Sequence, residues 1–146
     1  MKPKFDHERL HVYQASLELV RLAERLLENV PKGLPAWNQM NRASTSIPLN
    51  IAEGNGKFTS PDRCRFFDNA RGSGLECAAC LDLLFIKKLL AEHDLDAGKE
   101  RLRGIVSMLV GLIKSHDSSR LKGEAPACRV HEEPVVYRIG EGARVR

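Results

Sequence analysis

The sequence predicts an all-α fold: an antiparallel up-down-up-down four-helix bundle with a mostly irregular C-terminal tail. First, apolar residues recur at spacings of three and four over four segments, at about residues 7–29, 36–54, 61–91 and 94–116. Second, the connections between these segments are short, which makes neighbouring helices antiparallel. Third, 42% of the residues are hydrophobic and 5% aromatic, which suits a single soluble helical domain over residues 1–116.

The first segment carries apolar residues on an unusually wide arc. One stripe holds Val12, Leu19, Leu22, Leu26 and Val30, and a second stripe holds Leu10, Tyr13, Leu17 and Val20. An arc wider than one core contact needs indicates a helix that is covered on two sides. The second cover is either another helix of the same chain or a second subunit, and the residues leave both open.

The second segment has a continuous polar stripe beside its apolar one. The polar residues stand three and four positions apart, at Gln39, Arg42, Ser46, Asn50 and Glu53. Pro48 lies inside this helix, where it lacks a backbone donor and is expected to bend the axis. Gly54 and Gly56 tolerate positive φ angles, so we expect them to end the helix in a turn.

The third segment begins with a strong start signal, because Ser60 can cap the helix and Pro61 suits its first position. Gly72 and Gly74 lie in the middle of the same helix, where each weakens helix formation. A helix tolerates that cost where a neighbour must approach closely, so this pair predicts a close helix contact.

A second polar stripe lies on the third segment and is expected to face the polar stripe of the second. Its members are Asn69, Ser73 and Glu76, with Arg71 beside them. Arg42 and Glu53 on the second helix, with Arg71 and Glu76 on the third, would then supply compensating charges. Together the two stripes form a partly buried polar network, which fixes geometry more than it adds stability.

The fourth segment starts near Asp94, which can cap it, and continues with helical periodicity to about residue 116. Residues 117–146 contain scattered prolines and glycines without a helical period and are predicted to form a flexible tail. Within this tail, residues 135–139 favour a β conformation. They either belong to the irregular tail or dock on the bundle or on a partner.

No pattern of catalytic or metal-binding residues emerges. Cys77 and Cys80 have the spacing of a zinc or redox pair, but they fall in mid-helix without a second ligand pair, so we assign them to the core of a protein in a reducing compartment. Glu53 and Glu76 could act as paired carboxylates, yet a two-metal bundle needs a pair of inward Glu-x-x-His motifs, which the sequence does not supply. We therefore expect no enzyme, no metal and no cofactor.

No run of residues approaches the about 18 apolar positions that span a bilayer, and the N-terminus has no apolar signal-peptide core. We therefore expect a cytoplasmic protein that does not enter a membrane.

One long motif carries a family resemblance. The pattern Q-x-x-R-A-x-x-S-I-P-x-N-I-A-E-G over residues 39–54, followed by A-x-G-S-x-x-E over residues 70–76, resembles the four-helix-bundle proteins encoded within intervening sequences of bacterial 23S rRNA genes. This family also includes the accessory variability proteins of diversity-generating retroelements. The resemblance implies a bacterial protein that assembles into a homopentameric barrel with a basic face, associates with RNA or DNA, and has a reverse transcriptase as a possible protein partner.

Charge gives limited support to nucleic-acid binding, because the net charge of +4 permits contact with phosphate without requiring it. Lys57, Arg63 and Arg65 cluster around the turn and the start of the third helix, and we predict that they form the nucleic-acid-binding site. Four other cations are better explained as ion-pair partners or as a solvated helix end: Arg42, Arg71, Lys87 and Lys88. The alternative is a structural scaffold or protein-interaction module that binds no nucleic acid.

Overall fold

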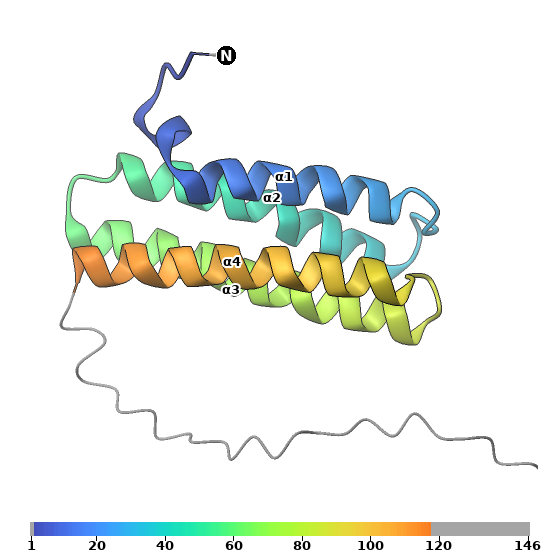
Figure 1. Ribbon diagram of the computed structural model, residues 1–146. Coiled ribbons are helices and arrows are strands. Elements are labelled where there is room, and N and C mark those ends of the chain that lie inside the picture. The colour runs from blue at the N-terminus through green and yellow to red at the C-terminus, as the bar shows by residue number, and fades with distance from the viewer. Residues whose placement is uncertain (1, 118–146) are drawn as a thin grey trace, which may run out of the picture.

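The structure is a computed structural model that describes residues 2–117 of the chain, and it confirms the all-α, up-down-up-down bundle (Figure 1). A short 3-10 helix, η1 (Asp6–Arg9), precedes four α-helices: α1 (His11–Leu27), α2 (Pro35–Gly56), α3 (Ser60–Ile86) and α4 (Glu92–His116). Over this range there is no strand, and no helix is long and apolar enough to cross a membrane. The predicted tail beyond Asp117, with its β-favouring run at 135–139, lies outside the described residues.

One core runs the length of the bundle, and the most extensive helix contact is between α2 and α3. Fully buried side chains from α2, α3 and α4 contribute to this core, including Ile47, Phe67 and Leu109. Of the two apolar stripes on α1, the one that contains Leu19 is buried in this core, as predicted. The other is only partly covered, and Leu17 on it is exposed to solvent.

The expectation that Gly54 and Gly56 end the second helix through positive φ angles is wrong. α2 runs through both residues, and no glycine in the described part of the chain has a positive φ. Gly54 is instead a point of close contact, since a Cβ added there would lie 2.9 Å from Cβ of Phe66 and 3.0 Å from Cε1 of Phe67. The missing side chain lets α3 approach α2, and the turn itself begins at Lys57.

The start of α3 is shifted by one residue from the prediction. Thr59, not Ser60, is the N-cap, and its hydroxyl accepts a hydrogen bond from the backbone N–H of Asp62 at 3.3 Å. The same hydroxyl donates to the Asp62 carboxylate at 3.0 Å, so the two side chains hold each other across the first turn. Pro61 still lies in that turn, where its missing donor costs nothing.

The end of α3 was predicted at residue 91, but the helix stops at Ile86. Lys88 takes up a left-handed conformation with φ of 60°. The backbone N–H of Lys88 donates to the carbonyl of Phe85, and that of Leu89 donates to the carbonyl of Leu84, each at 2.9 Å. This pair of bonds is a Schellman motif, which normally has glycine where this chain has lysine. Because a lysine occupies this position, the sequence does not indicate where α3 ends. Asp94 lies in the first turn of α4 instead of capping it.

The predicted close helix contact at Gly72 and Gly74 holds for only one of the two. Gly74 is buried, and a Cβ there would lie 3.3 Å from Cγ2 of Val106 on α4. Gly72 is exposed, with no atom within 4 Å of its would-be Cβ. A closer contact that the sequence analysis missed is at Gly98 on α4, where a Cβ would meet Cδ1 of Leu81 at 2.6 Å.

The side chains of Cys64, Cys77 and Cys80 are buried, as predicted for Cys77 and Cys80. Burial raises the pKa of Cys77 from 9.0 to about 12, and it also raises the pKa of Cys80. Within residues 2–117, no group of His, Cys, Asp and Glu side chains is arranged to hold a metal ion.

The raised pKa of Cys77 has two consequences that can be measured. In a Cys128→Ser background, which removes the thiol outside the described residues, we expect thiol labelling at pH 8 to be far slower in the native protein than in denaturant. The folded state also keeps the Cys77 proton to higher pH than the unfolded chain does. Stability should therefore be intact below about pH 9 and fall as the pH rises toward about 12. Rapid labelling of the native protein would contradict this burial.

Candidate nucleic-acid interface

The three cations predicted from sequence lie together at the α2–α3 turn. The guanidinium Nε of Arg63 donates a hydrogen bond to the backbone carbonyl of Lys57 at 2.7 Å. The Lys57 ammonium lies 4.7 Å from the ring centre of Phe66, and the guanidinium carbon of Arg65 lies 5.4 Å from the same ring. Both cations thus contact the ring of Phe66, and cation–π attraction keeps them near one another.

Phe58 lies in the same turn and is the most exposed large apolar side chain described, with a relative exposure of 101%. Its ring therefore packs against no other side chain in the part of the chain that the structure describes. We call the group of Lys57, Phe58, Arg63, Arg65 and Phe66 the turn cluster. Helical spacing predicts Phe66 on the core face of the third helix, but its ring is only partly buried and lies under two cations. Spacing alone also does not show that Phe58, in the turn, faces solvent.

Acidic residues offset part of the positive charge of the turn cluster. The Lys57 ammonium forms an ion pair with Glu53 at 3.6 Å, and Asp62 is held at the start of α3 by Thr59. Glu53 was predicted to belong to the polar network between α2 and α3, but its partner is Lys57 on its own helix end. The turn cluster is therefore a modestly basic site, and long-range attraction of phosphate by it is weak.

The remaining basic residues that the sequence analysis considered do not join the turn cluster. Arg71 pairs with Asp68 on its own helix at 2.9 Å, and Arg42 pairs with Glu76. Lys87 and Lys88 are exposed at the α3–α4 connection, which lies at the opposite end of the bundle from the α2–α3 turn (Figure 1).

The C-terminal end of α4 lies at the same end of the bundle as the turn cluster (Figure 1). The Cys64 thiol contacts the carbonyl of Ile113 at 3.8 Å, and the ring of His116 lies 5.9 Å from that of Phe67. The first two turns of α3, which carry two of the cations, are thereby tied to the last turn of α4.

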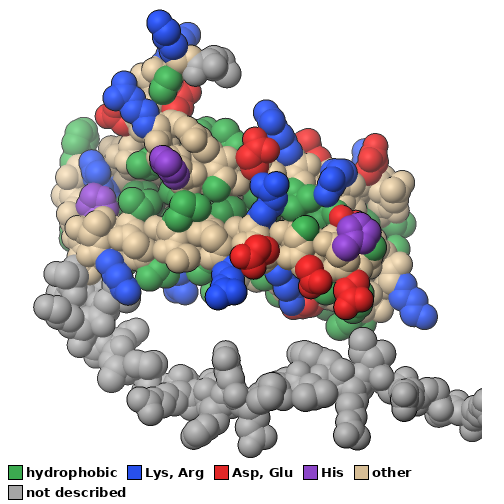
Figure 2. All heavy atoms as spheres, in the orientation of Figure 1, with side chains coloured by type: hydrophobic (Ala, Val, Ile, Leu, Met, Phe, Trp, Pro, Cys, Tyr) green, Lys and Arg blue, Asp and Glu red, His purple; other side chains and the backbone are tan. Residues whose placement is uncertain are grey.

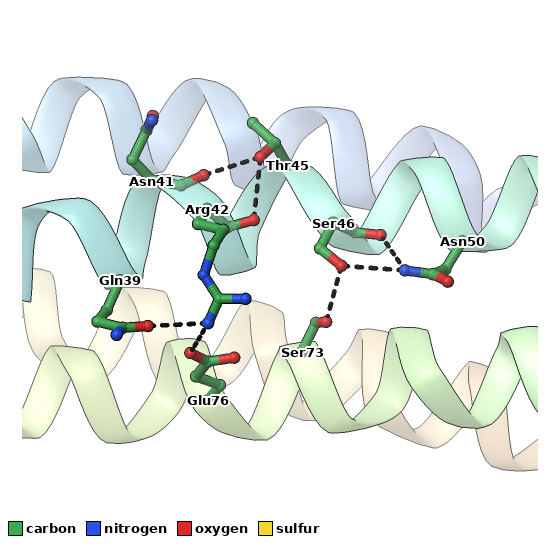
Figure 3. Close-up of polar contacts among 8 residues, drawn as sticks. All are labelled: Gln39, Asn41, Arg42, Thr45, Ser46, Asn50, Ser73 and Glu76. Atoms are coloured by element: carbon green, nitrogen blue, oxygen red, sulfur yellow. Dashed lines mark hydrogen bonds and ion pairs between the residues drawn. The ribbon is translucent and has the colours of Figure 1, made fainter.

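A polar seam joins α2 to α3, as predicted, but with different pairing (Figure 3). Its members are Gln39, Arg42, Ser46, Asn50, Ser73 and Glu76. Arg42 donates to Glu76 at 2.8 Å and to Gln39 at 2.9 Å. The Ser73 hydroxyl donates to the Ser46 hydroxyl at 3.0 Å, which in turn accepts from the Asn50 amide at 3.0 Å.

The predicted membership of this network is corrected in three places, because Glu53 and Arg71 pair elsewhere and Asn69 is exposed beside the seam. The seam is also less buried than expected. The side chain of Arg42 is 68% exposed and that of Glu76 is 37% exposed, so their ion pair contributes roughly 0–1 kcal/mol in the isolated chain.

The outer side of α3 carries an apolar stripe that the sequence analysis did not identify. Exposed residues follow one another at helical spacing in the order Asp68, Gly72, Leu75, Ala79, Leu83 and Ile86. Leu75, Leu83 and Ile86 are 51%, 49% and 72% exposed, respectively, and Leu49 on neighbouring α2 is 68% exposed. We call the surface formed by this stripe, Leu49 and the polar seam the α2/α3 face.

The corresponding outward stripe of α4 is quite different. At the same spacing it presents Asp96, Glu100, Arg103, Ser107, Gly111 and Lys114, all exposed. Figure 2 shows the side of the molecule formed by α1 and α4, where acidic and basic side chains are spread over both helices. From Gly72 to Ile86, the outer stripe of α3 thus lacks the charge that a helix normally presents to water.

Two hollows lie at the end of the bundle away from the turn cluster. One, of about 660 Å³, is lined by residues of α1 and α2 that include Arg21, Glu24 and Trp37. The other, of about 600 Å³, is lined by Phe85, Ile86 and Leu90 among others, and it continues the apolar stripe of α3.

Most of the chain matches a protein-family model and a solved structure. A family model described as 23S rRNA-intervening sequence protein matches residues 8–111. The chain is also similar to a crystal structure, at 1.70 Å resolution, of a protein with unknown function from the S23 ribosomal protein family of Bacteroides thetaiotaomicron VPI-5482. The two share 25% sequence identity with a TM-score of 0.65, over 70% of this chain and 98% of the other. No curated protein matches the sequence.

Proposed function

The chain belongs to the 23S rRNA-intervening sequence protein family, and from this membership we propose that it is a non-enzymatic, homo-oligomeric accessory protein that associates with RNA in the bacterial cytoplasm. The turn cluster is the proposed contact surface. The observation that carries the proposal is the gathering of Lys57 and Arg65 around the ring of Phe66, with Arg63 bonded to the backbone of Lys57, in the same turn as the fully exposed ring of Phe58. Cations beside exposed aromatic side chains suit a polymer made of phosphates and flat bases.

The α2/α3 face supports the proposed oligomerisation. A single turn cluster offers only three cations, of which Lys57 is already paired with Glu53, and so few contacts would give weak binding. A second copy that covers the α2/α3 face would repeat the turn cluster around an assembly and raise the avidity for one RNA. The ring of five implied by the family resemblance is our proposed assembly.

The α2/α3 face suits another copy of this chain better than it suits water. Its apolar stripe is free of charge from Gly72 to Ile86, and depletion of charged residues is the compositional mark of an interface core. The half-exposed Arg42–Glu76 pair would be desolvated there and would fix the register of the two copies. A scaffold that uses this face for a different protein, such as a reverse transcriptase, is the competing proposal.

Charge reversal separates RNA association from the scaffold. In the variant Lys57→Glu, Arg63→Glu, Arg65→Glu, we expect the affinity for structured RNA to fall at least about 100-fold at low salt, because each lost phosphate contact is replaced by repulsion. The measurement is a fluorescence-anisotropy titration with labelled RNA.

The matched control is Lys87→Glu, Lys88→Glu, which reverses two exposed cations at the far end of the bundle and should leave the affinity within about two-fold. Equal losses in the two variants would mean that net charge, not the turn cluster, determines binding. A wild-type protein that binds no RNA would leave the scaffold as the function.

A further inference from the structure

We propose that Phe58 is a stacking platform for an unpaired base, so that the turn cluster recognises single-stranded RNA in preference to duplex. The inference rests on the proposed RNA association and specifies which form of RNA is bound. The ring of Phe58 is in full contact with water, so it forgoes the favourable free energy that burial of an aromatic side chain would contribute. A ring that packs against none of residues 2–117 contributes nothing to the packing of the bundle.

The backbone on both sides of Phe58 is held in place. The carbonyl of Lys57 accepts from Arg63, and the N–H of Lys57 donates to the carbonyl of Gly54 at 3.2 Å. On the other side, Thr59 is fixed as the N-cap of α3 through its two contacts with Asp62. The ring therefore projects from a fixed point, and little further ordering of the backbone is needed when a base stacks on it.

The surroundings of the ring favour a nucleobase over an apolar protein surface. Its chain neighbours are Lys57 and Thr59, and the side chains of Lys57 and Arg65 are gathered next to the turn on Phe66. A docking site for an apolar partner would surround the aromatic residue with other apolar side chains, as on the α2/α3 face. An exposed ring in a turn that also carries cations offers one stacking surface for a base, with groups for phosphate in the same turn cluster.

The preference for single strands follows from geometry. In a duplex, both faces of each internal base are already covered by neighbouring pairs, so a protruding side chain could reach a free face only at the ends. In a single strand or a loop, bases can turn outward and stack on an aromatic side chain. Because every base has a flat face, this contact would be tolerant of sequence.

The test uses the full-length protein with an oligoadenylate of about 20 nucleotides, alone and annealed to its complement. We expect Phe58→Ala and Phe58→Leu each to lower the affinity for the single strand about ten-fold or more, and that for the duplex by less than about two-fold. Phe58→Trp should retain binding, and its fluorescence in a Trp37→Phe background should be quenched by the single strand. Phe5→Ala, which removes another exposed phenylalanine, is the matched control and should bind like the wild type.

Circular dichroism and Tm of Phe58→Ala should match those of the wild type, because the ring has no packing to lose. If Phe58→Ala binds the single strand as the wild type does, or loses duplex affinity equally, the stacking role is wrong while RNA association stands. If the wild-type protein binds neither polymer, both the stacking role and the proposed function fail.

Discussion

If the protein forms the proposed assembly, replacing Leu75 and Leu83 with glutamate is expected to convert it into folded monomers. Both side chains are about half exposed on the outer stripe of α3, so the isolated bundle should tolerate the change. In an interface, each carboxylate would be taken out of water without a partner, which costs several kcal/mol. Light scattering at micromolar concentration should show the mass of a single chain, with helical circular dichroism unchanged.

The matched control for this variant lies on α4. Arg103→Glu and Ser107→Glu introduce the same two carboxylates at exposed positions of an outward stripe that is already charged. We expect this variant to keep the mass of the wild-type assembly. A wild-type protein that is itself a monomer would disprove self-association, and an unchanged mass in Leu75→Glu, Leu83→Glu would move the interface away from the α2/α3 face.

Replacing Gly54 with leucine is expected to cost about 3 kcal/mol or more of unfolding free energy, a large part of the stability of a small domain. A Cβ at this position meets Cβ of Phe66, which cannot move without the backbone of α3, and the ring of Phe67, which is fully buried. α2 and α3, which form the most extensive helix contact of the bundle, would have to separate at this point. Urea denaturation followed by circular dichroism measures the loss.

In contrast to Gly54→Leu, the variant Gly72→Ala is expected to increase the unfolding free energy. This residue lies in the middle of α3 and is exposed, with open space where a methyl group would be placed. Alanine should therefore stabilise the helix by about 0.5–1 kcal/mol. If Gly54→Leu unfolds at the same urea concentration as the wild type, the close contact of α2 with α3 is wrong.

Much of the fold could be predicted from the sequence, because helical periodicity reports directly on which residues face the core. The stripe of α1 that contains Leu19 and the core position of Cys77 are examples. Helix ends were harder to predict. Lys88 adopts the left-handed conformation that glycine usually adopts at a helix end. Gly54 allows close packing of two helices instead of forming a turn. Residue identity alone was therefore misleading at both positions.

The candidate site was only partly predictable, for a similar reason. Three cations close together in sequence stay close in space when a short turn and one helical turn carry them, which is why the basic part of the turn cluster could be anticipated. Exposure depends on what the rest of the chain leaves uncovered, so neither Phe58 nor the outer stripe of α3 could be recognised beforehand. Arg71 was expected to compensate charge across the two helices, but its partner is Asp68, three positions earlier on the same helix.

The most direct test of RNA association through the turn cluster is the salt dependence of RNA affinity, measured side by side for the wild type and for the Lys57→Glu, Arg63→Glu, Arg65→Glu variant. Each phosphate contact contributes about 0.7–0.9 to the slope of log K against log salt. We predict that wild-type affinity falls steeply between about 50 and 200 mM salt and that the slope for the variant is smaller by about two to three units. Equal slopes for the two proteins, or a wild-type affinity that does not change with salt, would contradict the proposed interface.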